Sequence, residues 1–107
     1  MIMATTSELP GMTVKEVKGL VQGNTIRARN VGRDIMAGLR TLVGGEITEY
    51  TRLMTESRAQ ATQRMVDEAE KLGANTILGV RYTTSTVIAG AAELLAYGTA
   101  VVAEESS

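Results

Sequence analysis

A long stretch without glycine or proline, residues 46–72, limits the fold more than any other feature of this chain. Apolar and small residues recur along it every three or four positions, which is the spacing of one face of an α-helix. Glu46 and Glu49 stand in the first turn and Lys71 in the last, where each charge complements the helix dipole. The stretch therefore predicts one long amphipathic helix that must bury a face. The residues of that face are Ile47, Tyr50, Met54, Ser57, Ala61, Met65, Glu68 or Ala69, and Leu72.

Glycines mark both ends of this helix. Gly73 follows its last turn, where a left-handed residue commonly ends a helix. Gly44 and Gly45 precede it and follow a shorter helical pattern, from which we predict a short helix at residues 33–43. A phosphate cradle at this glycine pair would need a preceding strand and a nearby cation, whereas Glu46 would repel phosphate. We interpret Gly44, Gly45 and Gly73 as structural turns.

The remaining segments favour strands. The first run, "TVKEVKGLVQG", alternates imperfectly, and "TIRARN" follows it after Gly23-Asn24, which is a turn signal. These predict two short strands, or one strand and an extended segment. A third strand is predicted at "ANTILGVRYTTSTV". A fourth, "ELLAYGTAVVAEE", is apolar or small on both faces, as in a strand that is covered on both sides. We expect one of those covers to come from another chain.

These elements indicate one α+β domain. The expected subunit is a two-layer structure with a mainly antiparallel sheet, one long helix and one short helix. With 107 residues the chain is long enough for one domain and too short for two. We place the domain at residues 13–103, after a flexible N-terminal leader at residues 1–12. Residues 104–107 are expected to be a frayed C-terminus.

Composition excludes several classes of protein. The 11 basic and 12 acidic residues give a net charge of −1, which is unlike the basic surface of a nucleic-acid-binding protein. No apolar run is long enough to span a membrane, and the N-terminus is unlike a signal peptide. Without cysteine, no disulfide framework is possible, which fits a cytoplasmic protein. The absence of Phe and Trp leaves a core of small residues and suggests burial shared between subunits.

The chain offers little catalytic or metal-binding chemistry. It has no Cys and no His, so a Ser-His or Cys-His relay and the usual zinc, copper and nickel ligands are all absent. Its six Met are scattered and favour core packing over ligation. The segment "RNVGRD" gathers Arg29, Arg33 and Asp34 before or at a helix start. Such a cluster could bind an anion, but a surface ion pair or an interface contact is the simpler interpretation.

The order of several short motifs resembles one family. "RD", "AGLR", "VGGE", "EYT" and "LGAN" follow one another along the chain, with a closing "YGTAVV". This pattern is similar to the YbjQ family of small bacterial and archaeal proteins over nearly the whole chain. The resemblance implies a sheet with helices on one side and assembly into a ring, a homopentamer whose strands form a central barrel. It also implies a shared motif at Arg33, Asp34, Gly38, Arg40, Gly44, Gly45, Tyr50, Gly73, Ala74 and Asn75.

Three hypotheses of function follow. The first is a non-enzymatic, cytoplasmic, ring-forming homo-oligomer with a ligand-binding or scaffolding role and no cofactor, in which Arg33, Asp34, Arg40 and Tyr50 are the candidate binding residues. The second is a metal-binding module, as the family's heavy-metal label suggests. It would have to use carboxylate or Met ligands, because Cys and His are absent. The third is an enzyme at a subunit interface, with Tyr50, Arg40 and Asp34 as its acid-base and anion-binding groups.

Overall fold

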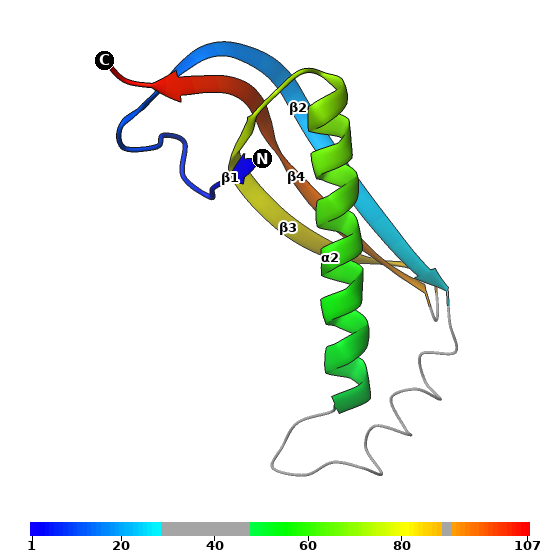
Figure 1. Ribbon diagram of the computed structural model, residues 1–107. Helices are drawn as coiled ribbons and strands as arrows, with labels where there is room; N and C mark the ends of the chain where they lie inside the picture. Colours follow the sequence, from blue (N-terminus) through cyan, green and yellow to red (C-terminus); the bar gives the residue numbers. More distant parts are fainter. Residues whose placement is uncertain (29–47, 89–90) are drawn as a thin grey trace.

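The structure is a computed structural model that describes residues 1–28, 48–88 and 91–107. Within those residues a four-stranded sheet lies behind one long helix (Figure 1). The elements are β1 (Ile2–Met3), β2 (Met12–Ala28), α2 (Thr48–Lys71), β3 (Thr76–Ile88) and β4 (Ala91–Glu105). The strand order is β1-β3-β4-β2. Strands β2 and β3 are antiparallel to β4, and β1 is parallel to β3. The predicted α+β class is confirmed, with a mixed sheet.

The long helix lies where its periodicity places it, and its bounds, Thr48–Lys71, fall inside the predicted range. Ser57, Ala61, Met65 and Ala69 are all buried, so the predicted face is the one that packs. Leu72, which the sequence pattern assigns to the same face, lies beyond the helix end and is 43% exposed. Four-residue spacing keeps the buried side chains in one row along the helix.

Gly73 and the residue after it form a two-bond cap at the end of α2. The N–H of Gly73 donates to the carbonyl of Glu70 at 3.0 Å, and the N–H of Ala74 donates to that of Ala69 at 3.1 Å. Gly73 has a φ of +80°, a conformation that glycine adopts without a Cβ penalty. This is the Schellman arrangement, and the burial of both Ala69 and Ala74 adds its usual apolar contact.

The predicted turn at Gly23-Asn24 is wrong, because β2 continues through it as one strand from Met12 to Ala28. Gly23 serves the packing of α2 instead. A Cβ at this position would overlap the carbonyl oxygen of Ala61 and the backbone nitrogen of Met65, and it would lie 2.8 Å from the Cβ of Arg64. The glycine therefore lets the backbone of the helix approach the backbone of the strand.

Two irregularities in β2 explain why its alternation was imperfect. The register against β4 shifts between Val14 and Glu16, and again between Val17 and Gly19. Each shift is typical of a β-bulge, which inserts one residue and reverses the face of those that follow. As a result Val14, Val17 and Leu20 share one face of the sheet although they are three residues apart. The face on the other side carries α2.

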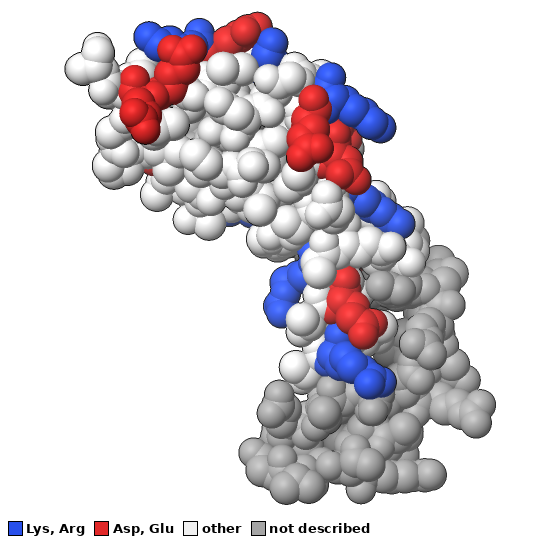
Figure 2. All heavy atoms as spheres, in the orientation of Figure 1, with Lys and Arg blue, Asp and Glu red and all other residues white. Residues whose placement is uncertain are grey.

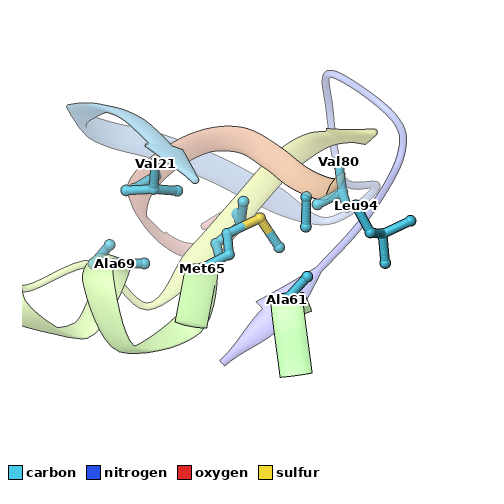
Figure 3. Packing of buried hydrophobic residues seen from close by; sticks show 10 residues of the cluster. Val21, Ala61, Met65, Ala69, Val80 and Leu94 are labelled. Carbon is cyan, nitrogen blue, oxygen red and sulfur yellow. The ribbon is translucent and has the colours of Figure 1, made fainter. Parts of the chain in front are cut away.

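The main core fills the space between α2 and the sheet. Met65 projects from the helix toward the strands, with Ala61 and Ala69 on the same helix and Val21 and Leu94 on the strands (Figure 3). The side chains are small, as expected of a chain without Phe or Trp. The helix packs mainly over β2 and β4 and scarcely over β3.

A second, smaller core lies on the other face of the sheet. Leu78, Val101 and Ala103 are buried there, and Ala4, Leu9 and Met12 pack over them. The first residues of the chain thus lie against the sheet, and β1 adds a short parallel strand beside β3. The mobility that we expect of residues 1–12 stays a prediction, as does fraying at residues 104–107. The predicted short helix at residues 33–43 lies outside the described residues.

We predict that Gly23→Ala destabilises the fold by about 1–3 kcal/mol or more, because backbone atoms of α2 must move to admit a methyl group. Urea unfolding would measure the loss. The neighbouring Gln22 is exposed, so Gln22→Ala is a matched control that should change stability by less than about 0.5 kcal/mol. Equal midpoints for the two variants would contradict the close approach.

We also predict that Gly73→Ala lowers stability by about 1 kcal/mol, because alanine is strained at positive φ. Asparagine tolerates the left-handed conformation better, so Gly73→Asn should lose less. Thermal unfolding of the two variants beside the wild type would show this order. A wild-type melting temperature for Gly73→Ala would contradict the cap.

Candidate functional site

The predicted site residues are not brought together within the described part of the chain. Arg33, Asp34 and Arg40, together with Gly44 and Gly45, lie outside the described residues. Tyr50 belongs to the first turn of α2, but its side chain is not described. Of the structural turns, Gly73 is described and caps α2. The proposed binding role of the other residues stays a prediction.

Asn75, a residue of the shared motif, has a structural role. Its Oδ1 accepts a hydrogen bond from the N–H of Ala103 at 2.9 Å, and its Nδ2 donates to the carbonyl of Ala103 at 2.9 Å. The side-chain amide therefore pairs with β4 as a backbone peptide would. This contact fixes the start of β3 against the end of β4, directly after the cap of α2.

One cavity among the described residues has a volume of about 270 Å³. It is lined by residues from the first half of α2, the second half of β2, the last part of β3 and the first part of β4. Thr25 and Ser57 are both 3% exposed, and Thr25 Oγ1 donates to the carbonyl of Ser57 at 3.2 Å. The lining residues are Thr25, Leu53, Met54, Ser57, Thr84, Ser85, Thr86, Ala92, Glu93 and Leu94.

The lining of this cavity is rich in hydroxyl groups and nearly free of charge. Glu93 is the one charged residue in the described lining, and its carboxylate accepts a hydrogen bond from Asn24 Nδ2 at 3.2 Å. Leu53, Met54 and Leu94 provide an apolar wall. The described lining suits a small neutral molecule, and it contains no pair of titratable groups of the kind that acid–base catalysis requires. Sequence reasoning missed it, although "TTST" at residues 83–86 was a signal for a hydroxyl-rich surface.

The donor set of this chain does not fit a heavy-metal site. The whole sequence has no Cys and no His, and the described residues contain no group of three or more acidic side chains close enough to hold an ion. Of the thioethers, Met65 is fully buried in the core. Soft metal ions prefer thiolate and imidazole ligands, which this sequence cannot supply.

An apolar stripe runs along β2 on the face of the sheet away from α2. It consists of Val14, Val17, Leu20 and Ile26, which are 42%, 64%, 69% and 55% exposed. We call these four residues the β2 stripe. The two register shifts place the first three on one face, and regular alternation from Leu20 brings Ile26 to the same face. Simple alternation of the sequence could not reveal the stripe, because it assigns Val17 to the opposite face.

Charges on the described surface are mixed rather than gathered by sign. Along α2 and over the top of the sheet, basic and acidic side chains alternate on the face that Figure 2 shows. The described residues also contain no helix that is long and apolar enough to cross a membrane.

Comparison with known proteins gives one consistent result. The YbjQ family model, described as "Putative heavy-metal-binding", matches residues 1–104. A UPF0145 protein of Clostridium perfringens is 54% identical over 106 residues, which cover 99% of this chain and 100% of that protein. One from Methanoculleus marisnigri is 57% identical over 101 residues, or 94% of each chain. One from Thermotoga maritima is 53% identical over 105 residues, covering 98% and 99%.

A solved structure supports the fold. The crystal structure of a protein of unknown function from Pediococcus pentosaceus, of the DUF74 family, superposes with a TM-score of 0.64. The superposition covers 97% of this chain and 98% of the other chain, and the two sequences are 19% identical. At that identity the likeness concerns the fold alone.

We predict that titration of the protein with zinc, copper or cadmium ions shows no binding tighter than about 100 μM, roughly −5.5 kcal/mol. Isothermal titration calorimetry at neutral pH would measure this. Dialysis against a chelator should leave the melting temperature unchanged. If the protein held a structural metal ion, removing that ion would lower the melting temperature. Stoichiometric micromolar binding would contradict the argument from the donor set.

Proposed function

This chain belongs to the YbjQ family, and from that premise we propose that it is a non-enzymatic, ring-forming homo-oligomer with a scaffolding or ligand-binding role. The β2 stripe carries the proposal. Monomeric soluble proteins rarely expose large apolar patches, and large exposed patches usually mark an interaction site. The stripe lies along one strand with its side chains facing the same way, so a single partner surface could cover all four.

The small core is a second support. Folding of a chain this short buries limited surface, and here neither Phe nor Trp contributes to it. Burying the stripe in an interface would add apolar burial at about 25 cal/mol per Å². Association would thus supply stability that the separate subunit lacks. The number of subunits, five, and the central barrel rest on the resemblance to the family.

The cavity beside α2 supports the ligand-binding part of the proposal. Its hydroxyl groups and apolar wall favour a small neutral molecule. A cytoplasmic location is part of the same proposal and rests on the absence of cysteine. For an enzyme at a subunit interface, and for a metal-binding module with carboxylate or Met ligands, the described residues offer no supporting observation.

We predict that native mass spectrometry of the purified protein gives the mass of a ring, five subunits by family resemblance. The substitution Leu20→Lys, at the most exposed residue of the stripe, should shift the mass to the monomer, because a buried lysine charge opposes association. Circular dichroism would establish that this variant is still folded.

The matched control is Ala59→Lys, which adds the same charge on the exposed side of α2 and should leave the ring intact. A monomeric wild type at micromolar concentration would overturn the proposal. If the Leu20→Lys variant keeps the full oligomeric mass, the β2 stripe is not part of the interface.

A further inference from the structure

The sheet ends in two strand edges that differ from each other. On one side, β2 is the last strand in the order, and no strand of the described residues pairs with its outer edge. On the other side, the start of the chain covers the first part of β3. Ala4 N donates to the carbonyl of Ile77 at 3.0 Å, Gly79 N to that of Thr6 at 2.9 Å, and Val80 N to that of Ala4 at 3.0 Å. From Arg81 to Ile88, no described strand pairs with the outer edge of β3.

The outer edge of β2 carries features that discourage pairing in its first half, and its second half is open, with no described strand beside it. The first half contains both register shifts together with Lys15 and Lys18, and natural proteins use bulges and lysines to prevent an edge strand from pairing. From Leu20 to Ala28 the pairing with β4 is unbroken. An unbroken, unguarded edge is a template for another strand.

The two open edges lie at the same end of the sheet. Asn24 of β2 is paired with Leu95 of β4, and Leu95 is paired on its other side with Thr83 of β3. The open parts of β2 and β3 therefore flank the same part of β4. This end is also where β2, β3 and β4 converge, away from β1 and the C-terminus (Figure 1).

We propose that the open edge of β2, from Leu20 to Ala28, pairs in parallel with the open edge of β3, from Arg81 to Ile88, in the next copy of the chain. This inference rests on the proposed ring and names its contact. Two different edges make a heterologous interface, which closes into a ring when the rotation between copies allows it. Each copy then uses both of its open edges, and none remains to recruit further chains.

The parallel orientation follows from the topology. Both β2 and β3 run antiparallel to β4, so they point in the same direction within one copy. Rotation about a ring axis keeps that direction, and the neighbour's β2 must therefore lie parallel to β3. The chain's own β1 is already parallel to β3 on this edge. The first residues thus occupy the part of the edge that the neighbour's strand does not reach, and they limit its register.

The contact also involves two residues of the β2 stripe, Leu20 and Ile26. In the joined sheet, Leu20 and Ile26 would stand beside side chains of the neighbour's β3 on the same face. Arg64 Nη1 donates to the carbonyl of Asn24 at 2.6 Å within this half of β2. A carbonyl oxygen has two lone pairs, so this contact from α2 is compatible with an added strand.

Engineered disulfides test the pairing, because the chain has no cysteine of its own. Gln22→Cys or Asn24→Cys on β2 is combined with Thr83→Cys or Ser85→Cys on β3, so that four double variants sample neighbouring registers. Within one copy β4 separates the two thiols by two strand spacings, about 9.6 Å, which is too far for a disulfide. After oxidation, at least one double variant should give a ladder of covalent oligomers on a denaturing gel, ending at the ring mass. Every single variant should stay monomeric on that gel.

The control pair is Glu70→Cys with Thr83→Cys. It places one thiol on the exposed side of α2 and should give no ladder. A covalent dimer from Gln22→Cys or Asn24→Cys alone would indicate symmetric β2–β2 pairing and overturn the inference. A native ring without a ladder from any double variant would overturn the pairing but not the ring. A monomeric native mass would overturn both.

Discussion

The contact between the backbone of α2 and the backbone of β2 at Gly23 determines how the two layers of this protein fit together. Ala61 and Met65 of the helix lie against the glycine so closely that no Cβ fits between them. This contact holds α2 over β2 and β4 and leaves β3 at the margin of the helix layer. Tyr82 on β3 is 45% exposed, and its hydroxyl group lies 2.8 Å from Thr62 Oγ1 of the helix.

The sequence predicts those parts of the fold that depend on local periodicity. The helix was found because its face repeats over many turns without a break, and the third and fourth strands because Thr, Val and Leu cluster there. Gly23 was misread because a glycine before asparagine is a common turn signal, whereas its reason here is a partner 38 to 42 residues away in the chain, the backbone of Ala61 to Met65. The β2 stripe was missed for a related reason. The two register shifts bring Val14, Val17 and Leu20 to one face, whereas simple alternation assigns Val17 to the opposite face.

The candidate site was harder to predict because its residues share no sequence pattern. Thr25, Ser57 and Leu94 come from a strand, the helix and another strand, and only the tertiary contact brings them to one cavity. The family description names heavy metals, but ligand chemistry is decided by the side chains present. A chain without Cys or His cannot offer the thiolate and imidazole groups that such ions prefer. Family membership therefore establishes the fold here, and the donor set limits what the family label can mean for this chain.

The first residues of the chain connect the fold to the proposed assembly. They cover Leu78 and Val101 on the face away from α2, so one end of that face has its own core. At the other end the same face presents Leu20 and Ile26 to solvent. The same residues fill the first part of the outer edge of β3 and stop at Val80. The first residues therefore cover the same end of the face away from α2 and of the outer edge of β3. The parts of that face and that edge that they leave uncovered both lie at the opposite end of the sheet. Burial within the chain and the proposed association between chains would thus use different parts of the same strands.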